Sequence, residues 1–206
     1  MRNGVPADNV RTERPARTGR RTLSRDDWAR AALEAMRESG LGAIAVEPLA
    51  ERLGTTKGSF YWHFKDRDAL IHAALEMWVA ESDAMMAAAA RITDPAERGR
   101  WLTEFAFTGP QGADITTTLL VNSQHPVVGP FLERVTQERI AWGAALNEEL
   151  GMPPEVARQH ALTAWMMAVG IALVRRGAPQ LLPQGDEADA YKRYVMELLR
   201  PPRAQA

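Results

Sequence analysis

The sequence contains no cysteine. This absence excludes disulfide bonds, thiolate metal sites and cysteine nucleophiles. A membrane-spanning segment is also missing, because the longest nearly unbroken apolar run, residues 161–174, is shorter than the ~20 residues that cross a bilayer. The basic N-terminus carries Pro and Arg where the apolar part of an export signal would stand. We therefore expect a soluble, cytoplasmic protein in which residues 161–174 form a buried helix.

The sequence also has almost no net charge, because 25 Lys and Arg residues and 26 Asp and Glu residues give a formal net charge of −1. A balanced total argues against nucleic-acid binding only if the charge is spread evenly. Residues 1–65, however, hold twelve basic and eight acidic side chains, so the remainder of the chain is acidic. The sequence thus predicts a basic head on an acidic body, which would meet DNA head-first.

Residues 1–22 are rich in Arg and Pro and almost free of large apolar residues. This composition predicts a disordered basic arm. Two interpretations of the arm are open. Its arginines contact the phosphates or a minor groove of DNA, or it is a solvated tail.

With 46% hydrophobic and 25% charged residues, the chain has the composition of a globular protein. Apolar residues recur at three- and four-residue spacing, without the alternation that predicts strands. We therefore expect an all-α fold. The expected helices cover residues 24–39, 46–53, 57–64, 66–91, 95–107, 113–123, 128–150, 154–176 and 187–200.

The four histidines, His63, His72, His125 and His160, do not follow a metal-ligand spacing. The sequence also has no Gly-rich phosphate loop, no nucleophile elbow and no HExxH motif. We therefore expect a protein that is not an enzyme and needs neither a metal nor a cofactor.

The most informative stretch is residues 46–64, in which two short helices flank a turn at Gly54. This is the outline of a helix-turn-helix. A helix over 57–64 would be about 12 Å long, which suits a major groove about 12 Å wide. Phe60 and Phe64 would face a small core, and the side chains around them would face DNA. The same features also fit a helix that only packs, or one that lies at a protein interface.

Residues 24–78 resemble the N-terminal domain of TetR-family transcriptional regulators. The matching positions are Leu49-Ala50, Gly54, the run from Lys57 to Lys65, and Leu70. The resemblance implies an N-terminal three-helix helix-turn-helix domain and a larger C-terminal helical domain that binds an effector and dimerises. It divides the chain into the arm (1–22), a DNA-binding domain (23–67) and an effector-binding domain (68–206).

The resemblance also implies the DNA contacts. By position, these would come from Thr56, Lys57, Gly58, Ser59, Tyr61, Trp62, His63 and Lys65. Lys57 and Ser59 are the best candidates to read bases, whereas Tyr61, His63 and Lys65 would bind phosphates. Ala45 departs from the family pattern, which often has a capping Thr or Ser there. Thr55 replaces a residue that is commonly small and apolar.

The C-terminal domain should supply an apolar effector pocket oriented by a few polar groups. The candidate lining residues are Trp101, Phe105, Leu119, Asn122, His125, Phe131, Trp142, Trp165 and Met166. Each could equally be ordinary core. The apolar and small residues of 161–174 suit either a central core helix or one side of a dimeric four-helix bundle.

Together, the pattern and the resemblance predict a sequence-specific DNA-binding transcriptional regulator. We expect a homodimeric repressor that a small-molecule effector releases from a palindromic operator. The alternative is a helical small-molecule-binding or protein-interaction module without operator recognition.

Overall fold

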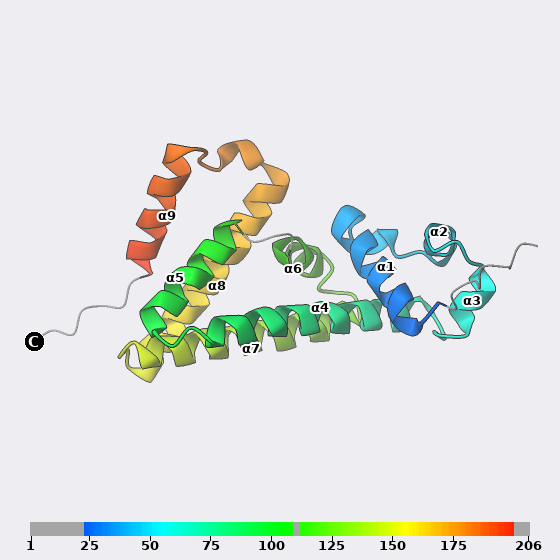
Figure 1. The fold of residues 1–206 in the computed structure, drawn as a ribbon, viewed down its shortest axis with the longest axis horizontal. Coiled ribbons are helices and arrows are strands. Elements are labelled where there is room, and N and C mark those ends of the chain that lie inside the picture. The colour runs from blue at the N-terminus through cyan, green and yellow to red at the C-terminus, as the bar shows by residue number, and fades with distance from the viewer. Residues whose placement is uncertain (1–22, 109–111, 200–206) are drawn as a thin grey trace, which may run out of the picture.

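The computed structural model describes residues 23–108 and 112–199, and every regular element in these two ranges is a helix (Figure 1). This confirms the all-α prediction. The predicted basic arm, residues 1–22, lies outside the described residues.

The helices follow one another in chain order with short connections. They are α1 (Arg25–Ser39), η1 (Leu41–Ala43), α2 (Val46–Arg52), α3 (Lys57–Tyr61), α4 (Arg67–Ala90), α5 (Pro95–Thr108), α6 (Gly112–Val121), α7 (Val128–Glu149), α8 (Pro154–Gly177), η2 (Pro179–Leu181) and α9 (Asp186–Leu198). Most bounds lie within two residues of those expected from the sequence.

Short-range contacts fix where the first helices begin and end. Ser24 Oγ accepts from the Asp27 N–H, and the Asp27 carboxylate accepts from the Ser24 N–H at 2.8 Å, which completes a capping box at α1. Asp66 caps α4 through the Ala69 N–H at 2.8 Å. Gly54 has φ +62°, so the turn between α2 and α3 uses a backbone conformation that favours glycine.

The third helix is shorter than predicted. The sequence suggested 57–64, but α3 ends at Tyr61, and the N–H groups of His63 and Phe64 both bond to the Phe60 carbonyl. The chain turns here because Asp66 must become extended to cap α4. Five residues make a helix of about 7.5 Å instead of about 12 Å.

An aromatic core holds the first three helices together and joins them to the start of α4. Phe60 meets Trp28 edge-on at 5.5 Å between ring centroids and stacks on Phe64 at 5.6 Å. Leu49 and Leu70 are buried in the same cluster. The cluster continues into the first turns of α7 and into α6, so α1–α3 are packed against the rest of the molecule.

The remaining helices form the body of the molecule. We call α1, η1, α2 and α3 the head. α4 begins beside the head and lies along α7, and α8 packs extensively on α7 (Figure 1). α6 lies between α1 and α8 and contacts both. In the described ranges, no helix is both long enough and apolar enough to span a membrane.

Candidate functional site

The helix-turn-helix presents one buried and one open side. Phe60 anchors α3 to the core and is fully buried. On the other side, Tyr61 is exposed and Trp62 is 88% exposed. Tyr61 and Trp62 thus leave two adjacent aromatic side chains accessible to a partner.

The predicted DNA-contacting residues gather on and beside α3. Those that are exposed are Thr56, Lys57, Gly58, Tyr61, Trp62 and Lys65, while Ser59 and His63 are half-buried. α3 itself lies at one end of the molecule's longest axis, far from α9 at the other end (Figure 1). The eight residues therefore form one accessible surface, which we call the reading surface.

Two helices of the head begin without a side-chain cap. Ala45 stands at the start of α2 and has no group that could cap it. Thr56 stands at the start of α3, but its hydroxyl accepts no capping hydrogen bond. The Thr56 hydroxyl therefore makes no hydrogen bond that caps α3.

Lys57 is already paired in the structure. Its Nζ donates to Glu47 Oε1 at 2.5 Å, from α3 to α2. This hydrogen bond raises the pKa of Lys57 and lowers the pKa of Glu47. Both side chains are more than half exposed, so water screens the pair and its contribution to stability is small. A competing anion can therefore replace Glu47 as the partner of Lys57 at little cost.

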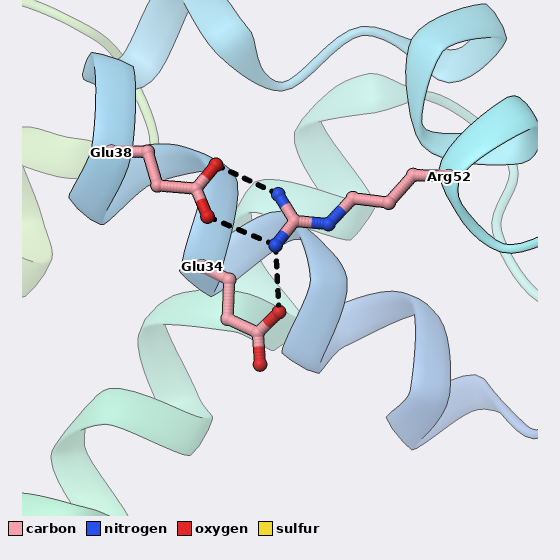
Figure 2. A network of polar contacts seen from close by, with 3 residues as sticks. All are labelled: Glu34, Glu38 and Arg52. Carbon is pink, nitrogen blue, oxygen red and sulfur yellow. Dashed lines mark hydrogen bonds and ion pairs between the residues drawn. The ribbon is translucent and has the colours of Figure 1, made fainter.

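The position of α2 is fixed by an arginine between two glutamates (Figure 2). Arg52 donates to both oxygens of Glu38, at 2.8 and 2.9 Å, and to Glu34 at 3.0 Å. The hydrogen bond to Glu38 raises the pKa of Arg52, and the same bond lowers the pKa of Glu38. A two-point contact of this kind is directional, so it holds α2 on α1 in one orientation.

A second arginine joins the head to α4. Arg67 Nε donates to the Ile44 carbonyl at 2.6 Å, and Arg67 Nη2 donates to the Leu41 carbonyl at 2.8 Å. No motif in the sequence predicted this contact. A signal was present, because a cation in the first turn of a helix opposes the helix dipole and therefore needs another partner.

The body contains a cavity of about 1020 Å³. Its walls come from α4, α5, α7, α8 and α9, with contributions from α1 and α6. Three of the predicted pocket residues line it, namely Phe105, Trp142 and Trp165. The volume lies at the upper end of the range of small-molecule sites.

Six other predicted pocket residues are not part of this lining. They are Trp101, Leu119, Asn122, His125, Phe131 and Met166. Leu119 and Phe131 belong to the cluster shared with the head, and Met166 is exposed on α8.

The polar pair expected to orient an effector lies elsewhere as well. The Asn122 amide donates to the Thr118 carbonyl, and His125 Nε2 lies 3.6 Å from Asp68 at the start of α4. Trp101 stacks on Phe105 from outside the cavity wall. The sequence supplied the residue types, but it did not determine which face of each helix turns inward.

The cavity contains polar residues that the sequence did not single out. Arg37, Glu81, Ser82 and Arg139 line it. Arg37 pairs with Glu81, and Arg139 donates to Ser82 Oγ at 2.6 Å and to Asp83 at 3.1 Å. Among the described residues, no group of three or more His, Asp or Glu could hold a metal ion.

The N-terminal part of the chain matches known proteins in sequence. Residues 29–74 match the family model described as "Bacterial regulatory proteins, tetR family". The tetracycline repressor protein class A from transposon 1721 of Escherichia coli is 42% identical over 53 residues, which are 26% of this chain. The matched segment spans about a quarter of that relative, 24% of its length.

The fold of most of the chain matches solved structures at low identity. A transcriptional regulator from Rhodococcus sp. Rha1 superposes with a TM-score of 0.72 at 21% identity, over 86% of this chain and 94% of that one. The transcriptional regulator FadR from Bacillus subtilis, solved with stearoyl-CoA, gives 0.61 at 14% identity, over 85% and 97%. The family match therefore covers the N-terminal segment, residues 29–74, and the fold of the described residues is similar to that of these solved regulators.

Proposed function

We propose that this protein is a transcriptional repressor that acts in the cytoplasm as a homodimer and binds a palindromic operator. A small molecule in the cavity releases it from DNA. We assign DNA binding to residues 23–67 and effector binding and dimerisation to residues 68–206. The observation that carries the proposal is the reading surface, which is open, basic and fixed on a rigid head.

The DNA-binding part is supported by the chemistry of that surface. Lys57 and Lys65 supply positive charge for phosphates, and Thr56 and Ser59 supply hydroxyl groups that can contact phosphates or base edges. Arg52 and Arg67 hold α2 and α4 in place. A preorganised surface loses little side-chain and backbone freedom on binding.

The effector part is supported by the cavity. It is lined largely by apolar and aromatic side chains with a few polar groups, the composition of small-molecule sites. The structural neighbour FadR was solved with stearoyl-CoA. α4 joins the two parts, because Arg67 at its start contacts the head and Trp78 and Met85 further along line the cavity.

The homodimer is supported by apolar side chains left open on the last two long helices. They are Val156, Leu162, Met166 and Leu173 on α8, and Tyr194 and Leu198 on α9. Large apolar side chains exposed at several positions of one helix are available to a protein–protein interface. A two-fold dimer would present two reading surfaces to successive major grooves.

A gel-shift titration with the DNA upstream of the protein's own coding sequence tests the proposal. We expect saturable binding that weakens steeply with salt and survives an excess of unrelated DNA. The double variant Lys57→Ala/Lys65→Ala, with both changes on exposed side chains, should abolish the shift without changing the circular dichroism spectrum. Wild-type protein that shifts no neighbouring promoter would instead favour a small-molecule-binding module without operator recognition.

A further inference from the structure

The cavity wall is suited to an aromatic guest. Trp78, Phe105, Trp142 and Trp165 line it, together with several methionines, among them Met85 and Met196. Aromatic rings prefer to stack or to meet edge-on, and methionine sulfur makes favourable contacts with ring edges. Methionine is also flexible, so the wall can adapt to guests of different outline.

The charged groups in the wall are arranged unequally. The Arg37 side chain is 24% exposed, whereas its partner Glu81 is 43% exposed. The Arg139 side chain is 11% exposed, whereas its partner Asp83 is 58% exposed. In both ion pairs the cation is the less exposed member. The cavity lining holds four arginines (Arg37, Arg100, Arg139 and Arg193) and two glutamates (Glu81 and Glu197), so its formal charge favours an anionic ligand.

Arg37 also has an unused donor. Its Nη2 donates to Glu81, but its Nε atom is buried and has no hydrogen-bond partner among the described residues. A buried donor without a partner costs free energy, and a planar guanidinium is shaped to bind a carboxylate at two points. Arg37 lines the cavity, so a ligand carboxylate can compete with Glu81 for the accessible part of its guanidinium group.

We infer that the cavity binds an aromatic carboxylate, whose rings lie among the tryptophans and methionines and whose carboxylate is bound by Arg37. This inference rests on the proposed effector-binding function and names the chemical class of the effector. Arg139 lines the same cavity and adds a second positive charge. The lining residue His160 adds none at neutral pH, because burial lowers its pKa.

The assignment also gives the ligand a direct connection to the DNA-binding head. Arg37 belongs to α1, whereas Glu81 belongs to α4. A ligand carboxylate on Arg37 competes with Glu81 for the same guanidinium. Binding therefore weakens an ion pair that joins the head to the helix leading from it.

A matched set of three probes tests the assignment on the free protein, without DNA. The probes are pyrenebutyrate, pyrenebutanol and pyrenebutylamine, which share one aromatic body and carry a negative, neutral or positive end. Binding is followed by the quenching of tryptophan fluorescence. We expect the carboxylate to bind roughly ten- to a hundredfold more tightly than the alcohol, the range for one hydrogen bond to a charged group.

Three variants separate the role of Arg37 from general effects. Arg37→Gln should remove the preference for the carboxylate and leave the affinity for the alcohol nearly unchanged. Glu81→Gln should act in the opposite direction and tighten carboxylate binding, because the ligand then competes with no internal anion. Arg91→Gln, an equal change of charge at an exposed residue outside the cavity, should change neither.

Several results would overturn the assignment. Equal or tighter binding of the alcohol or the amine would do so, as would an unchanged carboxylate preference in Arg37→Gln that remains folded. Failure of all three probes to bind would exclude an aromatic anion site. A gel shift run without any probe then shows separately whether the proposed DNA binding holds.

Discussion

At the residue scale, the reading surface depends on which side chains are free to exchange partners. Lys57 is bound by Glu47, both on the exposed side of the head. Lys65 is 3.8 Å from Asp66, with most of its side chain in water. Both lysines can therefore contact DNA, but Lys57 must first break its shorter ion pair with Glu47. Different roles for the two should appear as different dependences on base sequence and on salt.

Lys57→Ala tests base reading. If the ammonium contacts a base edge, its loss should cost about 1–3 kcal/mol at one operator position and little at the others. Affinities for a set of single-base operator variants, measured at one salt concentration, check this. A uniform loss across all operators would assign Lys57 to the phosphate backbone.

Glu47→Gln should have the opposite effect. It removes the partner that holds Lys57 and a negative charge beside DNA, so binding should tighten by up to about fivefold, since exposed ion pairs contribute up to about 1 kcal/mol. Glu51→Gln on the same helix is the matched control, because no ion pair links Glu51 to another described residue. Equal gains in the two variants would mean that only overall charge matters.

Lys65→Ala tests phosphate binding. Losing one phosphate contact should weaken binding to all sequences similarly and lower the slope of log affinity against log salt by about 1. Titrations at several salt concentrations on specific and unrelated DNA give this slope. An unchanged slope would remove Lys65 from the phosphate-binding set.

At the element scale, the short helices η1, α2 and α3 are held in position by contacts with other elements. The aromatic core fixes α3, the Arg52 network fixes α2, and Arg67 fixes the segment before α2 to the start of α4. Short isolated helices are marginal in water. These tertiary contacts are therefore what make the head rigid enough to present one surface.

Arg67→Met tests the junction between the head and α4. It keeps the aliphatic stem but removes the side-chain donor to the Ile44 carbonyl and one of the two donors to the Leu41 carbonyl, so we expect a loss of about 1–3 kcal/mol in the free energy of unfolding. Urea denaturation at one fixed protein concentration measures it. Arg30→Met, a change at an exposed arginine of α1, should shift stability by less than about 0.5 kcal/mol. Equal changes in the free energy of unfolding for the two variants would show that the hydrogen bonds from Arg67 to the two carbonyls do not stabilise the fold.

At the scale of the whole molecule, α4 joins the two functions. Its first turn contacts the head, its middle lines the cavity, and it lies along α7 (Figure 1). A change at the cavity can therefore reach α3 through one continuous helix. The proposed dimer interface lies on α8 and α9, where apolar side chains are exposed to water.

Met166→Asp tests the dimer. Because Met166 is exposed in one copy of the chain, the variant should fold but place a charge in the proposed interface. We expect sedimentation to show monomers and operator affinity to fall at least tenfold, since half-sites are then bound singly. Val121→Asp, at an exposed apolar residue of α6, is the control and should remain dimeric. A dimeric Met166→Asp protein would move the interface elsewhere.

The sequence by itself determined the all-α class, the caps at Ser24 and Asp66, the turn at Gly54 and the order of the helix-turn-helix. These features depend on residues only a few positions apart, and local chemistry decides them. The family pattern around Lys57 added the expectation of DNA contacts, again from neighbours in sequence.

Only the tertiary structure decided the length of α3 and which helix faces line the cavity. It also decided that Lys57 pairs with Glu47 and that Arg67 of α4 donates to backbone carbonyls of the head. A helix can turn many different residues inward by a small rotation, and partners such as Arg37 and Glu81 are 44 residues apart. Their meeting follows from the packing of all the helices at once, which no local pattern encodes.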